Sequence, residues 1–145
     1  MKILMIYPQI DGPLGTNHGI ASLAGVLHAN GHAMDLMHVS EKYQGVPSSA
    51  ELIDYIRDSK PGLVGFSVMS QQYDWVVEQS KAIRAALPEL VQTIGGVHCT
   101  MVPDEVHKSK LFDYVCVGEG DWALLELMDS LEKGEHPHTL SNFRS

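Results

Sequence analysis

Short apolar runs of strand length alternate with longer amphipathic stretches along the whole chain. The runs are rich in Val, Ile and Met, and the stretches between them repeat their apolar residues with a helical period. Strands that alternate with helices form parallel sheets with crossover connections, so this order predicts an α/β fold. The expected strands are residues 2–8, 33–39, 63–69, 91–95 and 114–117.

Start and stop signals place the helices between these strands. Gly31 ends the first helix, Ser49 is expected to cap the second, and Lys60-Pro61 must end it. The expected helices are residues 19–29, a segment after Ser49, 73–87, a short segment after Pro103, and 121–131. We therefore predict a flavodoxin-like, doubly wound parallel sheet of five strands with helices on both faces, in which residues 63–69 form the middle strand. Residues 1–134 would form the domain and 135–145 a linker or tail.

Charge and composition exclude several classes of protein. The 145 residues include 10 basic and 18 acidic ones, and the resulting net charge of −8 disfavours nucleic acid. No apolar run approaches the ~20 residues that span a bilayer, and the N-terminus lacks the cleavage site of a secretory signal, so we expect a cytoplasmic protein. Cys99 and Cys116 alone cannot form a four-thiolate metal site.

Ligands of such a sheet bind outside the carboxyl ends of its strands, and four segments of this chain leave that edge. The first, residues 8–19, is longer than most strand-to-helix loops, which suggests a lid or a ligand contact. It lacks the Gly-Lys-Ser/Thr ending of a P-loop, and the chain contains no G-x-G-x-x-G. Nucleoside triphosphates and dinucleotides are therefore disfavoured.

The second segment, residues 67–73, offers small hydroxyl and amide groups to a polar ligand. Alternatively, Ser70 caps the next helix and Ser67 is an interior hydroxyl. The third segment contains Gly95-Gly96, which either lets a bulky group approach the backbone or allows a turn with positive φ. The fourth, Gly118-Glu119-Gly120, precedes Asp121, which we expect to be a helix N-cap.

These motifs together resemble the N-terminal cobalamin-binding domain of B12-dependent radical S-adenosylmethionine enzymes. The resemblance covers nearly the whole chain and rests on G-I-A-S-L-A from Gly19, V-G-F-S-V-M at 64–69, G-G-V-H at 95–98 and V-G-E-G at 117–120. It implies a module that binds cobalamin and presents it to a radical domain holding S-adenosylmethionine and a [4Fe–4S] cluster, commonly for methyl transfer. No C-x-x-x-C-x-x-C occurs here, so that domain would lie outside this chain, in cis or in trans. Either the chain is an excised domain, which its abrupt end favours, or it is a free-standing binder.

The wider B12-binding family carries D-x-H-x-x-G, S-x-L and G-G. The second motif corresponds to Ser67-Val68-Met69 and the third to Gly95-Gly96, which the resemblance places around the dimethylbenzimidazole tail. With Gly19 as the last residue of the first motif, Leu14 and Thr16 stand at the Asp and His positions. The resemblance therefore implies base-off cobalamin without a protein histidine on cobalt. The expected cofactor-binding residues are Ser67, Val68, Met69, Ser70, Gly95, Gly96, His98, Cys99, Gly118, Glu119 and Gly120.

Two histidines lie near the proposed crevice. His18 could approach cobalt, although a capping or solvated role also fits its position, and His98 could donate to a corrin amide or a loop carbonyl. His32 is expected in a turn. Trp122 could stack on the ligand, but its amphipathic helix favours a core position.

Two other functions stay open at this point. A flavin- or phosphate-binding flavodoxin-like protein would need a hydroxyl- and glycine-rich first loop, which Thr16 and Asn17 supply only in part. The domain could also serve only in assembly, with no ligand. The module is not expected to be catalytic by itself.

Overall fold

The computed structural model describes residues 1–140 and 142–144 as alternating strands and helices. The strands are β1 (Lys2–Pro8), β2 (Ala33–Val39), β3 (Leu63–Ser67), β4 (Val91–Gly95), β5 (Tyr114–Cys116) and β6 (Phe143–Arg144). The helices are α1 (His18–Ala29), α2 (Ser49–Ser59), a 3-10 turn η1 (Ser70–Gln72), α3 (Tyr73–Ala86), α4 (Val97–Met101), α5 (Pro103–Lys108) and α6 (Asp121–Glu132). No described helix is long and apolar enough to cross a membrane.

The sheet has the order β2-β1-β3-β4-β5-β6. Strands β1 to β5 pair in parallel, which confirms the flavodoxin-like, five-stranded parallel sheet. The sixth strand, β6, was not anticipated and pairs antiparallel with β5. It lies in the segment predicted as a tail, so the chain after residue 134 returns to the edge of the sheet.

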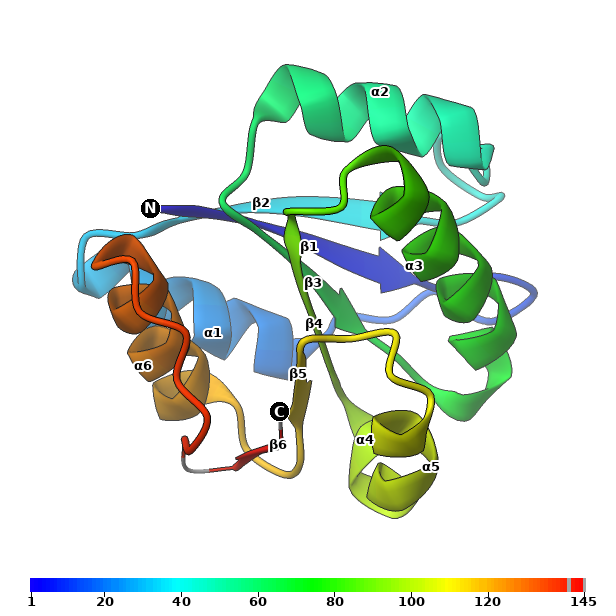
Figure 1. Cartoon of the computed structure of the whole chain (residues 1–145). Coiled ribbons are helices and arrows are strands. Elements are labelled where there is room, and N and C mark those ends of the chain that lie inside the picture. Colours follow the sequence, from blue (N-terminus) through cyan, green and yellow to red (C-terminus); the bar gives the residue numbers. More distant parts are fainter. Residues whose placement is uncertain (141, 145) are drawn as a thin grey trace.

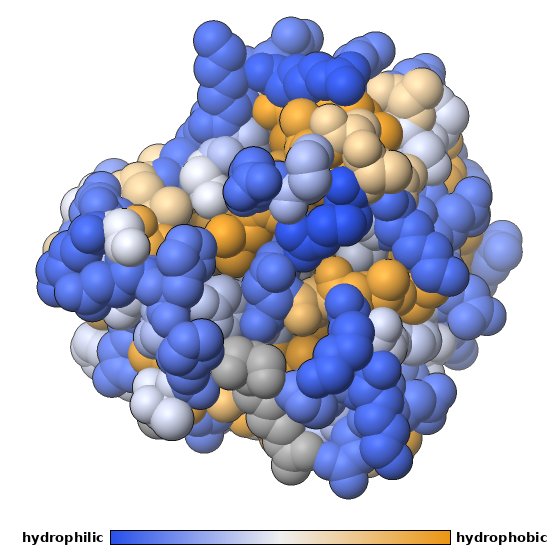
Figure 2. All heavy atoms as spheres, viewed as in Figure 1, coloured by the Kyte–Doolittle hydropathy of each residue, from blue (hydrophilic) through white to orange (hydrophobic). Residues whose placement is uncertain are grey.

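Helices cover both faces of the sheet (Figure 1). Alternate residues of the central strands pack in two clusters, because side chains of a strand point to opposite faces. Leu4, Phe66 and Ile94 belong to the cluster that includes residues of α2, α3 and α5. Ile3 and Leu63 belong to the cluster that includes residues of α1 and α6. Figure 2, drawn from the same side, shows mainly hydrophilic side chains, with hydrophobic ones visible in gaps between them.

Most predicted element bounds are confirmed within a residue or two, and the exceptions have local causes. The strand predicted at 63–69 ends at Ser67, and the Val68 N–H still donates to the carbonyl of Gly95, the last residue of β4. The five-residue helix α4 directly after Gly96 was missed. It is short, and its sequence Val-His-Cys-Thr-Met carries no helical period that could announce it.

The two predicted helix caps, Ser49 and Asp121, and the alternative cap Ser70 are wrong. Ser48, one residue before the predicted Ser49, caps α2, and its hydroxyl and the Glu51 carboxylate form a reciprocal capping box. Ser70 begins η1 instead of capping the third helix, whose N-cap Gln72 makes no side-chain cap bond. Asp121 is the first residue of α6 and accepts a hydrogen bond from Ser22 Oγ at 2.8 Å. In the last two cases the side chain has a distant partner, which is Ser22 for Asp121 and His98 for Ser70.

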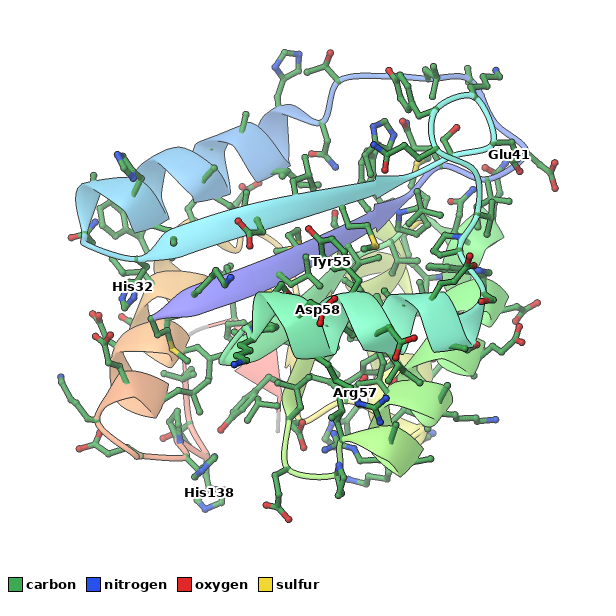
Figure 3. The ribbon with its side chains drawn as sticks, turned by 90° about the horizontal axis from the view of Figure 1, so that it is seen from above. His32, Glu41, Tyr55, Arg57, Asp58 and His138 are labelled. Carbon is green, nitrogen blue, oxygen red and sulfur yellow. The ribbon has the colours of Figure 1, made fainter. Side chains whose placement is uncertain are left out.

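His32 ties the start of the sheet to α6. Its ring is buried, with Nε2 2.9 Å from Asp129 Oδ1 and Nδ1 3.0 Å from the Met1 amino nitrogen. Figure 3 shows His32 at the same end of the sheet as the end of α6. The predicted role in a turn is therefore incomplete, since this histidine joins α6, ninety-seven positions along the chain, to the strands that α6 covers.

Candidate functional site

A cavity of about 470 Å³ opens at the carboxyl ends of the strands, on the face covered by α1 and α6. Its volume falls within the range of roughly 300–1,000 Å³ that is typical of small-molecule sites. Residues of β1, β3, β4, β5 and β6 line it together with residues of α1, α4 and α6. The site predicted at this edge of the sheet therefore coincides with a real hollow in the described part of the chain.

The floor of the cavity consists of small side chains. At the carboxyl ends of β3 and β4, the residues that face α1 and α6 are Gly65, Ser67, Thr93 and Gly95, and they pair as Gly65 with Thr93 and Ser67 with Gly95. The alternating residues on the opposite face include Phe66 and Ile94, which are buried in the other core cluster. The two central strands are thus bulky on one face and nearly bare on the other at this end. A flat group could lie on such a floor.

Two of these positions are closely surrounded. A Cβ on Gly65 would lie 3.1 Å from Met5 Cε and from Ile3 Cδ1. A Cβ on Gly95 would lie 3.3 Å from Cys116 Cβ. Glycine in the interior of a strand commonly marks such a close approach. Gly65 and Gly95 therefore leave room for the neighbouring side chains of Met5 and Cys116 and add no side chain of their own to the cavity floor.

The walls come from helices and from the last strand. Ile20 and Leu23 of α1, Leu124 of α6 and Phe143 of β6 line the cavity. The α1 helix begins at the mouth because the Asn17 side chain accepts a hydrogen bond from the Ile20 N–H at 3.0 Å. The cap therefore sets where the wall starts.

Two glycine turns form the mouth, and Thr100 joins them. Gly96 has a φ of +101° and Gly118 a φ of +81°. The Thr100 hydroxyl donates to the Gly96 carbonyl at 3.2 Å and accepts from the Gly118 N–H at 3.0 Å. Asn142 Nδ2 donates to the Glu119 carbonyl at 2.8 Å. These bonds hold the loops after β4 and β5 at a fixed separation.

Gly96 also allows the turn after β4 to pack closely against the backbone after β3. A Cβ at this position would lie 2.8 Å from both the nitrogen and the carbonyl oxygen of Val68. The Val68 carbonyl also accepts from the His98 N–H at 3.2 Å. The backbone after β3 and the turn after β4 therefore pack against each other, which only glycine permits here.

Three predicted residues, Ser70, His98 and Cys99, do not line the cavity. His98 Nδ1 is 3.0 Å from Ser70 Oγ, and its ring lies against Tyr73 at a centroid distance of 4.2 Å. Burial raises the pKa of the Cys99 thiol to about 12. Cys116, which does line the cavity, has a pKa raised to about 11 by burial, and the nearby Glu119 adds to the shift. Both cysteines are therefore neutral thiols near neutral pH.

None of the described residues that line the cavity is a histidine. His18 is the first residue of α1, and its side chain is exposed outside the lining. Within residues 1–140 and 142–144, no three His, Cys, Asp or Glu side chains gather in a way that could hold a metal ion. The site therefore offers shape and hydrogen bonds and supplies no ready set of metal ligands.

The structure brings most of the predicted site residues together and adds several. The predicted residues that line the cavity are Ser67, Val68, Met69, Gly95, Gly96, Gly118, Glu119 and Gly120. Ser70, His98 and Cys99 do not line it. Sequence reasoning did not name Leu23, Leu124 and Phe143 as site residues, although Leu23 lies in the motif quoted from Gly19. Leu124 and Phe143 come from distant elements and have no local motif. Gly65, a glycine inside an apolar strand, was a signal that could have been used. Trp122 is 69% exposed and outside the lining, so its predicted core position is wrong.

Comparisons with known proteins agree with this geometry. A family model described as B12 binding domain matches residues 12–128. An anaerobic magnesium-protoporphyrin IX monomethyl ester cyclase from Rubrivivax gelatinosus is 25% identical over 92% of this chain and 25% of its own length. A cytidylyl-2-hydroxyethylphosphonate methyltransferase from Streptomyces wedmorensis is 27% identical over 86% of this chain and 25% of its own length. The chain thus spans about a quarter of each of these relatives.

A solved structure shares the fold at lower identity. The radical S-adenosylmethionine methyltransferase TsrM from Kitasatospora setae, with cobalamin and a [4Fe–4S] cluster bound, has a TM-score of 0.83 and 18% identity. The likeness covers 98% of this chain and 28% of that one.

Proposed function

Because this chain belongs to the B12 binding domain family, we propose that it binds cobalamin with the nucleotide tail in the cavity between the sheet and helices α1 and α6. The small floor of Gly65, Ser67, Thr93 and Gly95 is the observation that carries the proposal. A planar aromatic base needs a slot that is open on one side and free of large side chains on its floor. The cavity has both properties.

The residues at the mouth suit a broad apolar ring. Met69, Val97 and Met101 line the cavity and are 45%, 56% and 71% exposed. Apolar side chains held this far in water at the rim of a cavity are typical of a binding surface. In our proposal they lie against the corrin, while Ser67 is close enough to the tail to form a hydrogen bond with its base.

We propose that cobalamin is held base-off and that no protein histidine occupies the lower face of cobalt. The absence of histidine from the part of the lining that the structure describes and the exposed position of His18 support this state. Thr16, at the position where the wider family has histidine, is exposed as well. Bound cobalamin supplies cobalt-centred alkyl-transfer chemistry, and this chain's residues supply its binding and orientation.

We further propose that the module works with a radical S-adenosylmethionine domain, in cis or in trans, in methyl transfer. The support is that the related methyltransferase from Streptomyces wedmorensis and TsrM are several times longer than the region they share with this chain. The chain contains no C-x-x-x-C-x-x-C for a cluster. In this scheme, residues 1–134 form the binding domain, and the module alone is not catalytic.

Titration of the purified chain with hydroxocobalamin tests the proposal. We expect equimolar binding that survives gel filtration, with an absorption spectrum typical of the base-off cofactor, because the cavity separates the base from cobalt. Flavin mononucleotide, titrated in parallel, serves as the control ligand and should not bind. Retention of the flavin without cobalamin would support a flavodoxin-like function instead. Failure to bind either ligand would contradict the proposal and favour a role in assembly.

A further inference from the structure

The cavity changes character with depth. Its strands run toward the mouth, so residues that come earlier in each strand lie deeper in the cavity. The deeper residue of each pair on one strand is Met5 relative to Tyr7, Gly65 relative to Ser67, and Thr93 relative to Gly95. The helices α1 and α6 begin at the mouth, which places Leu23 and Leu124 deeper than Asn17 and Asp121. The charged and amide side chains of the lining therefore belong to the mouth.

The deep part of the cavity offers a bound base almost no hydrogen bond. Met5, Leu23 and Leu124 are apolar, and Gly65 has no side chain. The only deep hydroxyl in the described lining is that of Thr93, which donates its proton to the Tyr114 carbonyl at 3.1 Å. At the mouth, Asn17 is engaged by the Ile20 N–H and Asp121 by Ser22. No side chain in the deep part is thus free to donate a hydrogen bond to a ring nitrogen.

From this gradient we propose that the cavity selects corrinoids by their nucleotide base, and that it takes a benzimidazole in preference to an adenine. This inference rests on the proposed function. A dimethylbenzimidazole presents carbon atoms and two methyl groups along the edge that enters first. An adenine presents an exocyclic amine and ring nitrogens along the same edge, and the ring nitrogens, to which no deep side chain can donate, lose their hydrogen bonds to water.

Titration with two corrinoids that differ only in the base tests this inference. Cobalamin and its adenine-bearing analogue share the corrin ring, the ribose and the phosphate, so any difference in affinity reports on the base. We expect the adenine form to bind about tenfold more weakly or worse, as burial of one unpaired polar group implies. Equal affinities, or tighter binding of the adenine form, would overturn the base selectivity and leave the proposed function intact. If neither corrinoid binds, both fail.

A matched pair of variants locates the selectivity in the deep wall. Leu23→Gln brings an amide into the deep part from α1, where the leucine is only half-buried, so the fold should tolerate it. We expect the affinity ratio of the two corrinoids to shrink several-fold. Leu36→Gln is the control, because Leu36 is exposed on the edge strand β2 and outside the cavity lining. An unchanged ratio in a folded Leu23→Gln variant contradicts the inference, and the wild-type comparison decides it if that variant does not fold.

Discussion

Replacing Ser67 with leucine should abolish cobalamin binding and leave the fold intact. Ser67 is half-buried at the end of β3, paired with Gly95 on the floor of the cavity. A leucine here projects into the space proposed for the nucleotide base, and forcing that much extra volume into an occupied site costs on the order of 3 kcal/mol. The affinity should therefore fall by about a hundredfold or more, as measured by titration with hydroxocobalamin.

The unliganded chain should tolerate the same change, because an apolar side chain in an apolar-walled cavity creates no clash. Ser67→Ala is the matched control: it removes the hydroxyl without adding volume and should weaken binding by about tenfold at most, as expected for one hydrogen bond. A Ser67→Leu variant that still retains cobalamin would show that the ligand does not lie on this floor. Near-ultraviolet circular dichroism would check that the variant is folded.

Replacing Gly96 with alanine should destabilise the whole domain by about 3 kcal/mol or more. The backbone at Gly96 has a φ of +101°, and a Cβ would lie 2.8 Å from two backbone atoms of Val68. Backbone atoms cannot turn away as a flexible side chain can, so β3 and β4 must separate at their carboxyl ends. The free energy of unfolding in urea measures the effect.

Gly118→Ala is the control that separates the cost of a positive φ from the cost of a steric clash with Val68. Gly118 has a φ of +81°, and an added Cβ would meet no described atom within 4 Å. This variant should lose only the roughly 1–2 kcal/mol of a side chain in the left-handed region. Equal losses in the two variants would mean that the contact with Val68 contributes nothing.

The contrast between these two glycines shows what the sequence could predict about the site. Paired glycines after a buried strand were expected either to let a bulky group approach the backbone or to allow a turn with positive φ, and Gly96 shows both a close neighbour and a positive φ. They could not distinguish a ligand from another part of the chain, and at Gly96 the neighbour is Val68. Gly95, whose Cβ would meet only the side chain of Cys116, is the better candidate for a position that keeps space for a ligand.

Local signals predicted the sheet well because they act within a few residues. Apolar runs, Gly31 and Pro61 determined the bounds of β1, β2 and α2 to within a residue of those observed. The helix caps that were predicted wrongly involve side chains that form hydrogen bonds with residues far away in the sequence. Ser70 binds His98, and Asp121 accepts from Ser22 on another helix. Capping preferences are read from neighbouring residues, so they cannot predict a hydrogen bond to a residue that only the folded chain brings close.

The walls of the cavity were beyond sequence reasoning for the same reason. Leu23 and Leu124 are apolar residues of amphipathic helices, and although Leu23 lies in the motif quoted from Gly19, neither position shows by itself that it lines a cavity. Phe143 reaches the cavity from a segment predicted as a linker, through a strand of only two residues. The division at residue 134 stays a prediction, but a variant that lacks β6 would lose part of this wall.

Comparison of cobalamin with cobinamide, which carries the corrin ring without the nucleotide tail, tests the central claim most directly. An aromatic group of this kind buries roughly 150 Å² or more, worth about 4 kcal/mol at 25 cal/mol per Å² before the costs of ordering the tail. We therefore expect cobalamin to bind about a hundredfold more tightly than cobinamide in paired titrations. Equal affinities would show that the tail stays outside the cavity and would contradict the account.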